Sequence, residues 1–85
     1  MKTFEYTIKD ELGIHARPAG ELVKEVKNYE SEISITSNGR KVNASKLMMV
    51  MSLGVKKGMT ITVTAEGADE DAAAAGIQKF LEENL

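Results

Sequence analysis

The segment over residues 13–19 contains the only histidine of the chain, and its residue types are suited to phosphoryl chemistry. His15 supplies a nitrogen nucleophile, and Pro18 indicates that a helix begins close by, because early helical N–H groups have no intrahelical partner for a proline to remove. The N–H groups next to His15, at Ala16 and Arg17, therefore stay free and form an anion site with the positive end of the helix dipole. The Arg17 guanidinium adds a permanently charged donor for phosphate oxygens. The pattern predicts a phosphohistidine site, and these residues alone leave an exposed histidine without chemistry as an open alternative.

The flanking sequence predicts the elements that position this segment. Residues 2–8 alternate in polarity as a half-buried strand does, and apolar residues spaced three and four apart predict an amphipathic helix from Ala16 to Val26. Asn38-Gly39 is suited to the positive φ angles of a hairpin turn. The other expected elements are the two strands of that hairpin around 33–35 and 42, a short helix within 45–54, a strand over 59–65, and a helix that is capped by Asp69 and buries Ala73, Ile77, Phe80 and Leu81.

The order strand, helix, strand, strand, helix, strand, helix predicts the fold class. It is typical of an α+β fold in which one antiparallel sheet is covered on one face by helices, as a two-layer sandwich. A chain of 85 residues with 42% hydrophobic content supports a single core. We therefore expect residues 1–85 to form one domain.

The composition argues against several classes of function. The chain has no cysteine and one histidine, so we expect no disulfide, no metal site and no cofactor. No segment approaches the roughly 20 apolar residues of a membrane span, and no secretory signal is visible, so we expect a cytoplasmic protein without membrane insertion. Residues 33–65 contain five basic residues and no acid, but also no aromatic residue for stacking on bases, so nucleic-acid binding is not favoured.

The segment over residues 47–53 has six apolar residues out of seven. A helix of two turns that packs on one side cannot bury all of them, so some must face solvent or a partner. We expect Val50 and Met51 to lie in the core, where methionine commonly fills irregular gaps. Met48 and Met49 are adjacent on the helix, about 100° apart, and cannot both point at the core centre. We expect these two methionines to face a partner protein.

Three motifs of the chain resemble the family of histidine-containing phosphocarrier proteins, HPr, of the bacterial sugar phosphotransferase system. The first is similar to the active-site motif of that family, Gly13-Ile14-His15-Ala16-Arg17-Pro18-Ala19. The second is similar to its short second helix, Leu47-Met48-Met49-Val50-Met51-Ser52-Leu53-Gly54, and the third precedes its last helix, Glu66-Gly67-Ala68-Asp69-Glu70. The resemblance spans essentially the whole chain and implies an open-faced β-sandwich with four antiparallel strands and three helices.

The resemblance also implies a role for each site residue. His15 would accept phosphate on Nδ1 from phosphorylated enzyme I and give it to sugar-specific enzyme II components such as enzyme IIA domains, while Arg17 would steady the phosphoryl group. The chain would be an intermediate carrier rather than a stand-alone enzyme, and such a shuttle is expected to be a monomer. Partners would dock on the first two helices, at Ala16, Arg17, Gly20, Lys24, Lys27, Leu47, Met48, Met49 and Met51. Basic residues around this apolar patch, Lys46 included, would attract acidic partner surfaces.

One position departs from the family pattern. Many Gram-positive members carry a regulatory serine immediately before the aliphatic-Met pair, where this chain has Lys46, and Ser45 stands one residue earlier. In the family, an HPr kinase phosphorylates that serine, which weakens phosphotransfer and creates a corepressor for a catabolite-control regulator. Lys46 has the opposite charge to a phosphoserine. We expect Ser45 to be a helix N-cap, a role worth about 1 kcal/mol, with regulatory phosphorylation of Ser45 as the alternative.

Two other functions compete with a sugar-linked carrier. A nitrogen-branch carrier or a regulatory relative would act through the same docking surface, and His15 does not distinguish these branches. A small phosphatase would use His15 as its nucleophile, but hydrolysis needs a positioned water and a general acid or base, and the histidine motif supplies no carboxylate. The sequence therefore favours a carrier over a hydrolase.

Overall fold

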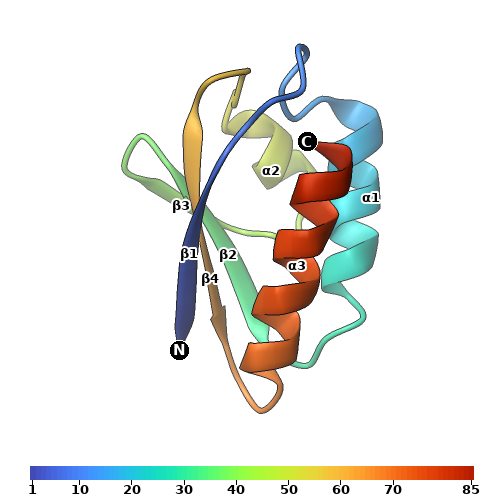
Figure 1. The fold of residues 1–85 in the computed structure, drawn as a ribbon, viewed down its shortest axis with the longest axis vertical. Coiled ribbons are helices and arrows are strands. Elements are labelled where there is room, and N and C mark those ends of the chain that lie inside the picture. The colour runs from blue at the N-terminus through green and yellow to red at the C-terminus, as the bar shows by residue number, and fades with distance from the viewer.

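The computed structural model describes residues 1–85 and contains one four-stranded antiparallel sheet with three helices on one of its faces (Figure 1). The elements, in chain order, are β1 (Lys2–Thr7), α1 (Ala16–Val26), β2 (Glu32–Ser37), β3 (Arg40–Asn43), α2 (Leu47–Ser52), β4 (Thr60–Glu66) and α3 (Glu70–Asn84). This βαββαβα order confirms the predicted α+β, open-faced sandwich. No helix of the structure is both long and apolar enough to cross a membrane.

The sheet has the strand order β1-β4-β2-β3, with every neighbouring pair antiparallel. Alternation along each strand separates its two faces. Ile35 of β2 and Val63 of β4 are paired, and both are buried beneath the helices. The open face is polar instead, and the hydroxyls of Thr7 and Thr60 are hydrogen-bonded across β1 and β4 at 2.9 Å. The polarity of this face explains why the sheet needs helices on one side only.

The β2–β3 turn is the hairpin that the sequence predicts. Asn38 and Gly39 have φ angles of 52° and 79°, which are the left-handed values that a two-residue hairpin loop requires. Ser37 of β2 then pairs with Arg40 of β3. The tight turn fixes the register of the hairpin and leads the chain directly toward α2.

The helices bury the apolar residues that the sequence predicts to be buried, with two exceptions. Leu22 of α1, and Ile77 and Leu81 of α3, are almost completely buried against the sheet. Ala16 is exposed rather than buried, because it is the first residue of α1 and lies beyond the edge of the core. Phe80 is half-buried at the margin of the core rather than buried.

Of the two predicted helix caps, Asp69 stands at the N-cap position of α3 as expected, and Ser45 does not cap α2. Asp69 precedes α3, and its carbonyl accepts the Ala73 N–H at 2.8 Å, but its side chain makes no capping hydrogen bond. Its carboxylate instead accepts hydrogen bonds from the N–H groups of Glu30 and Ser31 and from the Ser31 hydroxyl. These are more hydrogen bonds than the carboxylate would accept as a helix cap. The prediction that Ser45 is an N-cap is wrong. Lys46 precedes α2, and the Ser45 hydroxyl donates to Asn43 Oδ1 at 2.7 Å.

Candidate functional site

The loop over residues 8–15 presents the predicted site, and it is anchored on both sides. Gly13 has a φ of 67° and lies so close to the backbone of Val55 that a Cβ would overlap it. The next residue, Ile14, is buried and donates its N–H to the Val55 carbonyl at 3.1 Å. At the other end of the loop, the N–H groups of Lys9 and Asp10 donate to the Leu85 backbone oxygen. The loop is therefore held between the segment after α2 and the end of α3.

His15 stands at the N-cap position of α1 with an extended backbone, and its side chain is 37% exposed. Its carbonyl accepts the Ala19 N–H at 3.0 Å, which begins the helix. The N–H groups of Ala16 and Arg17 have no hydrogen-bond partner, and Pro18 has no N–H to offer. The structure thus places free donors and the positive helix end directly after the imidazole, which is the arrangement that binds an anion.

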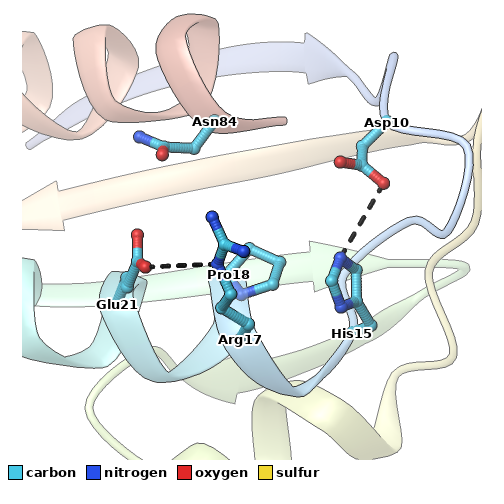
Figure 2. A pocket seen from close by; sticks show the side chains of 6 residues that line it. All are labelled: Asp10, His15, Arg17, Pro18, Glu21 and Asn84. Atoms are coloured by element: carbon cyan, nitrogen blue, oxygen red, sulfur yellow. Dashed lines mark ion pairs between the residues drawn. The ribbon is translucent and has the colours of Figure 1, made fainter.

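Asp10 is a carboxylate beside His15 that the sequence reasoning missed. Its Oδ1 lies 3.9 Å from His15 Nε2, as Figure 2 shows. The same Oδ1 accepts the Leu12 N–H at 2.8 Å, so the carboxylate is fixed within its own loop. The histidine motif of residues 13–19 itself contains no carboxylate, but the loop turns back on itself at Gly13 and brings position 10 next to position 15. The available signal was an acidic residue in the loop that leads to the histidine.

Arg17 reaches outward from the first turn of α1. Its side chain is 87% exposed, and its Nε lies 3.8 Å from Glu21 Oε1, one helical turn further on (Figure 2). An exposed pair of this length contributes little to stability, so Arg17 is free to leave Glu21 for a stronger anion. The spacing of four residues between Arg17 and Glu21 could have predicted this ion pair from the sequence.

These side chains surround a shallow pocket of about 180 Å³. Its lining residues are Asp10, His15, Arg17, Pro18, Glu21 and Asn84. Two carboxylates outnumber the single guanidinium, so an incoming phosphoryl group depends on Arg17 and on the helix start for its charge stabilisation. No three His, Asp or Glu side chains are grouped so that they could hold a metal ion.

The residues assigned to partner docking lie on α1 and α2 or directly beside them, and α2 lies at the end of the molecule where the loop of residues 8–15 enters α1 (Figure 1). The expectation that Met51 lies in the core is wrong, because it is 38% exposed while Val50 is fully buried. Val50 is the one buried residue of α2, and Met51 follows it about 100° further around the helix. The other large exposed side chains of α2 are Leu47 at 39%, Met48 at 77% and Met49 at 42%.

The surface around these apolar side chains is basic and open. Lys24, Lys27 and Lys46 are exposed and form no ion pair within the chain. Gly20 is half-buried, and a Cβ at this position would meet no atom, so the surface of α1 is unobstructed there. The sequence reasoning missed Leu12, which is 72% exposed in the loop beside the pocket.

Comparisons with known proteins show the family of this chain. A family model described as the PTS HPr component phosphorylation site matches residues 2–83. The HPr structure from Thermoanaerobacter tengcongensis is 37% identical, with 98% of this chain and 93% of that chain covered and a TM-score of 0.93. The histidine-containing phosphocarrier protein from Mycoplasma is 36% identical, with coverage of 96% and 93% and a TM-score of 0.93.

A relative with a different description also matches. The catabolite repression protein Crh from Bacillus subtilis, whose structure is an intertwined dimer with a swapped domain, is 32% identical, with coverage of 94% and 92% and a TM-score of 0.79. The HPr family therefore includes regulatory relatives and dimeric forms beside the phosphocarriers. From the match over residues 2–83 and these solved structures, the chain belongs to the HPr family of the phosphotransferase system.

Proposed function

We propose that this chain is a phosphocarrier that accepts a phosphoryl group from phosphorylated enzyme I on His15 and transfers it to enzyme IIA domains. The observation that carries the proposal is the position of His15 directly before α1, next to the unpartnered N–H groups of Ala16 and Arg17. Membership of the HPr family supports a carrier role within the phosphotransferase system. The exposed apolar face of α2 supports transient docking of a protein donor and a protein acceptor.

The proposed reaction uses the groups at the helix start in sequence. Neutral His15 attacks phosphorus through a ring nitrogen, and the bond from phosphorus to the donor's leaving atom breaks, with the electron pair staying on that atom. The oxygens of the transferred group accept hydrogen bonds from the N–H groups of Ala16 and Arg17, and the helix dipole stabilises their charge. Arg17 leaves Glu21 and binds the same oxygens, because a phosphoryl group carries more charge than a single carboxylate.

The partners are proposed from the character of the surface around His15. Gly20 leaves the surface of α1 open, and Met48, Met49 and Met51 offer flexible apolar contact area that adapts to different partners. Lys24 lies on α1, Lys27 directly follows α1 and Lys46 directly precedes α2, and these lysines would meet acidic partner surfaces. Small, adaptable contacts suit a carrier that must release each partner quickly.

Intact-mass spectrometry after incubation with phosphoenolpyruvate and enzyme I tests the proposal. We expect one acid-labile phosphoryl addition to the natural chain and none to His15→Ala. No addition in the presence of demonstrably active sugar-branch enzyme I would contradict the sugar-carrier role. An addition that appears only with the nitrogen-branch enzyme would assign the chain to that branch instead.

A regulatory function is the second candidate, and the similarity to Crh favours it. The half-buried Ser45 would be the phosphorylated residue, just before Lys46 and α2. Incubation with HPr kinase and ATP tests this candidate, with Ser45→Ala as the control. A label that disappears in Ser45→Ala would support regulation through a catabolite-control partner, whereas an unlabelled chain would remove it.

A further inference from the structure

The carboxylate of Asp10 places a negative charge in a site that, under the proposed function, receives an anion. Its Oδ1 lies 3.9 Å from His15 Nε2, and a phosphoryl group on the same ring would carry about two negative charges. Coulomb repulsion alone would therefore make Asp10 a hindrance to phosphoryl acceptance. A role for Asp10 has to act through the imidazole rather than through the phosphoryl group.

The structure holds Asp10 firmly on the Nε2 side of the ring. Its backbone N–H is bound to the Leu85 oxygen at 2.9 Å, and its Oδ1 accepts the Leu12 N–H at 2.8 Å. Figure 2 shows Nε2 facing this carboxylate, while the second ring nitrogen lies on the side of the ring away from it. A movement of about 1 Å would convert the 3.9 Å separation into a hydrogen bond, and such bonds are often long before the substrate arrives.

We propose that Asp10 is a positioning residue that holds the Nε2 proton of neutral His15 and so keeps the lone pair on Nδ1 for attack on phosphorus. This inference rests on the proposed function and adds the choice of nitrogen to it. A neutral imidazole carries its proton on one nitrogen only, and the partner of that N–H decides which nitrogen is nucleophilic. A carboxylate accepts hydrogen bonds and cannot donate one when it is ionised, so Asp10 selects the tautomer with the proton on Nε2.

The transfer step then balances without movement of a proton. The Nδ1 lone pair forms the new bond to phosphorus, the bond from phosphorus to the donor's leaving atom breaks, and that atom keeps the electron pair. The Nε2 proton stays in place, and the phosphorylated ring gains a positive charge opposite the Asp10 carboxylate. Asp10 thereby stabilises the product as well as orienting the nucleophile.

Long-range ¹H–¹⁵N correlation spectra of the free protein at pH 8.5 test the tautomer directly. We expect the natural chain to hold its proton on Nε2. In Asp10→Asn, the amide still offers an oxygen to the Leu12 N–H but can present an N–H to Nε2, so the ratio of Nε2–H to Nδ1–H forms should fall about tenfold or more. This readout needs no partner protein and is unaffected by defects in docking.

Initial rates of phosphoryl acceptance from enzyme I are the second measurement, with Glu11→Gln as the matched control. Glu11 belongs to the same loop, but its side chain is 88% exposed and does not line the pocket. Both variants remove one negative charge. We expect Asp10→Asn to slow acceptance about ten- to hundredfold, as loss of a group that orients a histidine does elsewhere, and Glu11→Gln to leave the rate unchanged.

The outcomes separate this inference from the proposed function. A natural chain that accepts no phosphoryl group defeats the proposed function before Asp10 is considered. If the natural chain accepts phosphate and Asp10→Asn changes neither the tautomer ratio nor the rate, the positioning role is overturned. A slower Asp10→Asn with an unchanged tautomer ratio overturns it too, because the defect would then be structural, and a rate increase would show that Asp10 acts only by repulsion.

Discussion

At the scale of single residues, the fold places charges where the local sequence does not suggest them. Asp69 illustrates this, since its carboxylate leaves the N-terminus of α3 and binds the chain at Ser31, 38 positions away in sequence. The hydrogen bond from the Ser31 hydroxyl, followed by the bond from the Glu30 N–H, holds the pKa of Asp69 below its ordinary value. The ionised form of Asp69 is therefore tied to the folded state.

This linkage predicts how stability depends on pH. A carboxyl whose pKa is lower in the folded chain stabilises it above the unfolded pKa of about 4, and the stabilisation is lost as the pH falls through the folded pKa. We expect Asp69→Asn to have a lower free energy of unfolding than the natural chain at pH 7, and the difference to shrink below pH 4. Urea denaturation at both pH values measures it, with the exposed Asp71→Asn as control. An equal difference at pH 7 and at pH 2.5 would contradict the linkage.

At the scale of elements, α1 and α3 each contain an internal glycine, and the two have opposite surroundings. A Cβ on Gly20 of α1 would meet no atom, whereas a Cβ on Gly76 of α3 would overlap the hydroxyl of Tyr29. That hydroxyl donates to Glu25 at 2.9 Å, so the tyrosine is fixed at the end of α1 and fills the notch that Gly76 leaves. Gly76 is thus required by the packing of the two helices, and Gly20 is not.

Alanine substitutions should therefore change stability in opposite directions. We expect Gly20→Ala to raise the free energy of unfolding by up to about 1 kcal/mol, because alanine is the better helix former. Gly76→Ala should lower it by about 1–3 kcal/mol, the usual range for overpacking. Thermal and urea unfolding measure both changes. In a Tyr29→Ala background, Gly76→Ala should no longer lower the free energy of unfolding. A decrease that persists in this background would disprove the packing explanation.

The elements and the site were predictable to different degrees for a physical reason. Alternation and helical spacing are local signals, so the four strands, the three helices and the Asn38-Gly39 turn could be predicted from the sequence. His15 and Arg17 belong to one contiguous motif and could be identified as well. Asp10 beside His15 and Tyr29 against Gly76 depend on how loops and helices meet, which no local pattern encodes.

At the scale of the whole molecule, charge is segregated along the chain. Residues 33–65 carry five basic residues and no acid, and they include α2, β3 and all of β2 except its first residue. Arg40 of β3 also donates to the Ser52 carbonyl at the end of α2 at 3.2 Å. Residues 66–85, which include α3, carry six acids and one lysine, Lys79. Acidic partners should therefore approach over α2 rather than over α3.

Reversing the charge of one lysine beside α2 and of one lysine on α3 tests this direction of approach. Lys46→Glu and Lys79→Glu change the net charge by the same amount, but only Lys46 lies next to the exposed face of α2. We expect Lys46→Glu to lower kcat/KM for phosphoryl acceptance about tenfold at low salt, and the loss to fade as ionic strength rises. Lys79→Glu should leave kcat/KM unchanged. Equal losses in both variants would show that net charge, and not the docking face, controls the encounter.

The central claim is that His15 both receives and returns a phosphoryl group, and a chase experiment tests it most directly. The chain is phosphorylated with enzyme I and phosphoenolpyruvate, separated from both, and mixed with an enzyme IIA domain while intact masses are followed. We predict that the label persists for minutes in the isolated chain, then leaves it and appears on the enzyme IIA domain in equal amount. Release as free phosphate without a partner, or labelling of the His15→Ala chain, would contradict the carrier role.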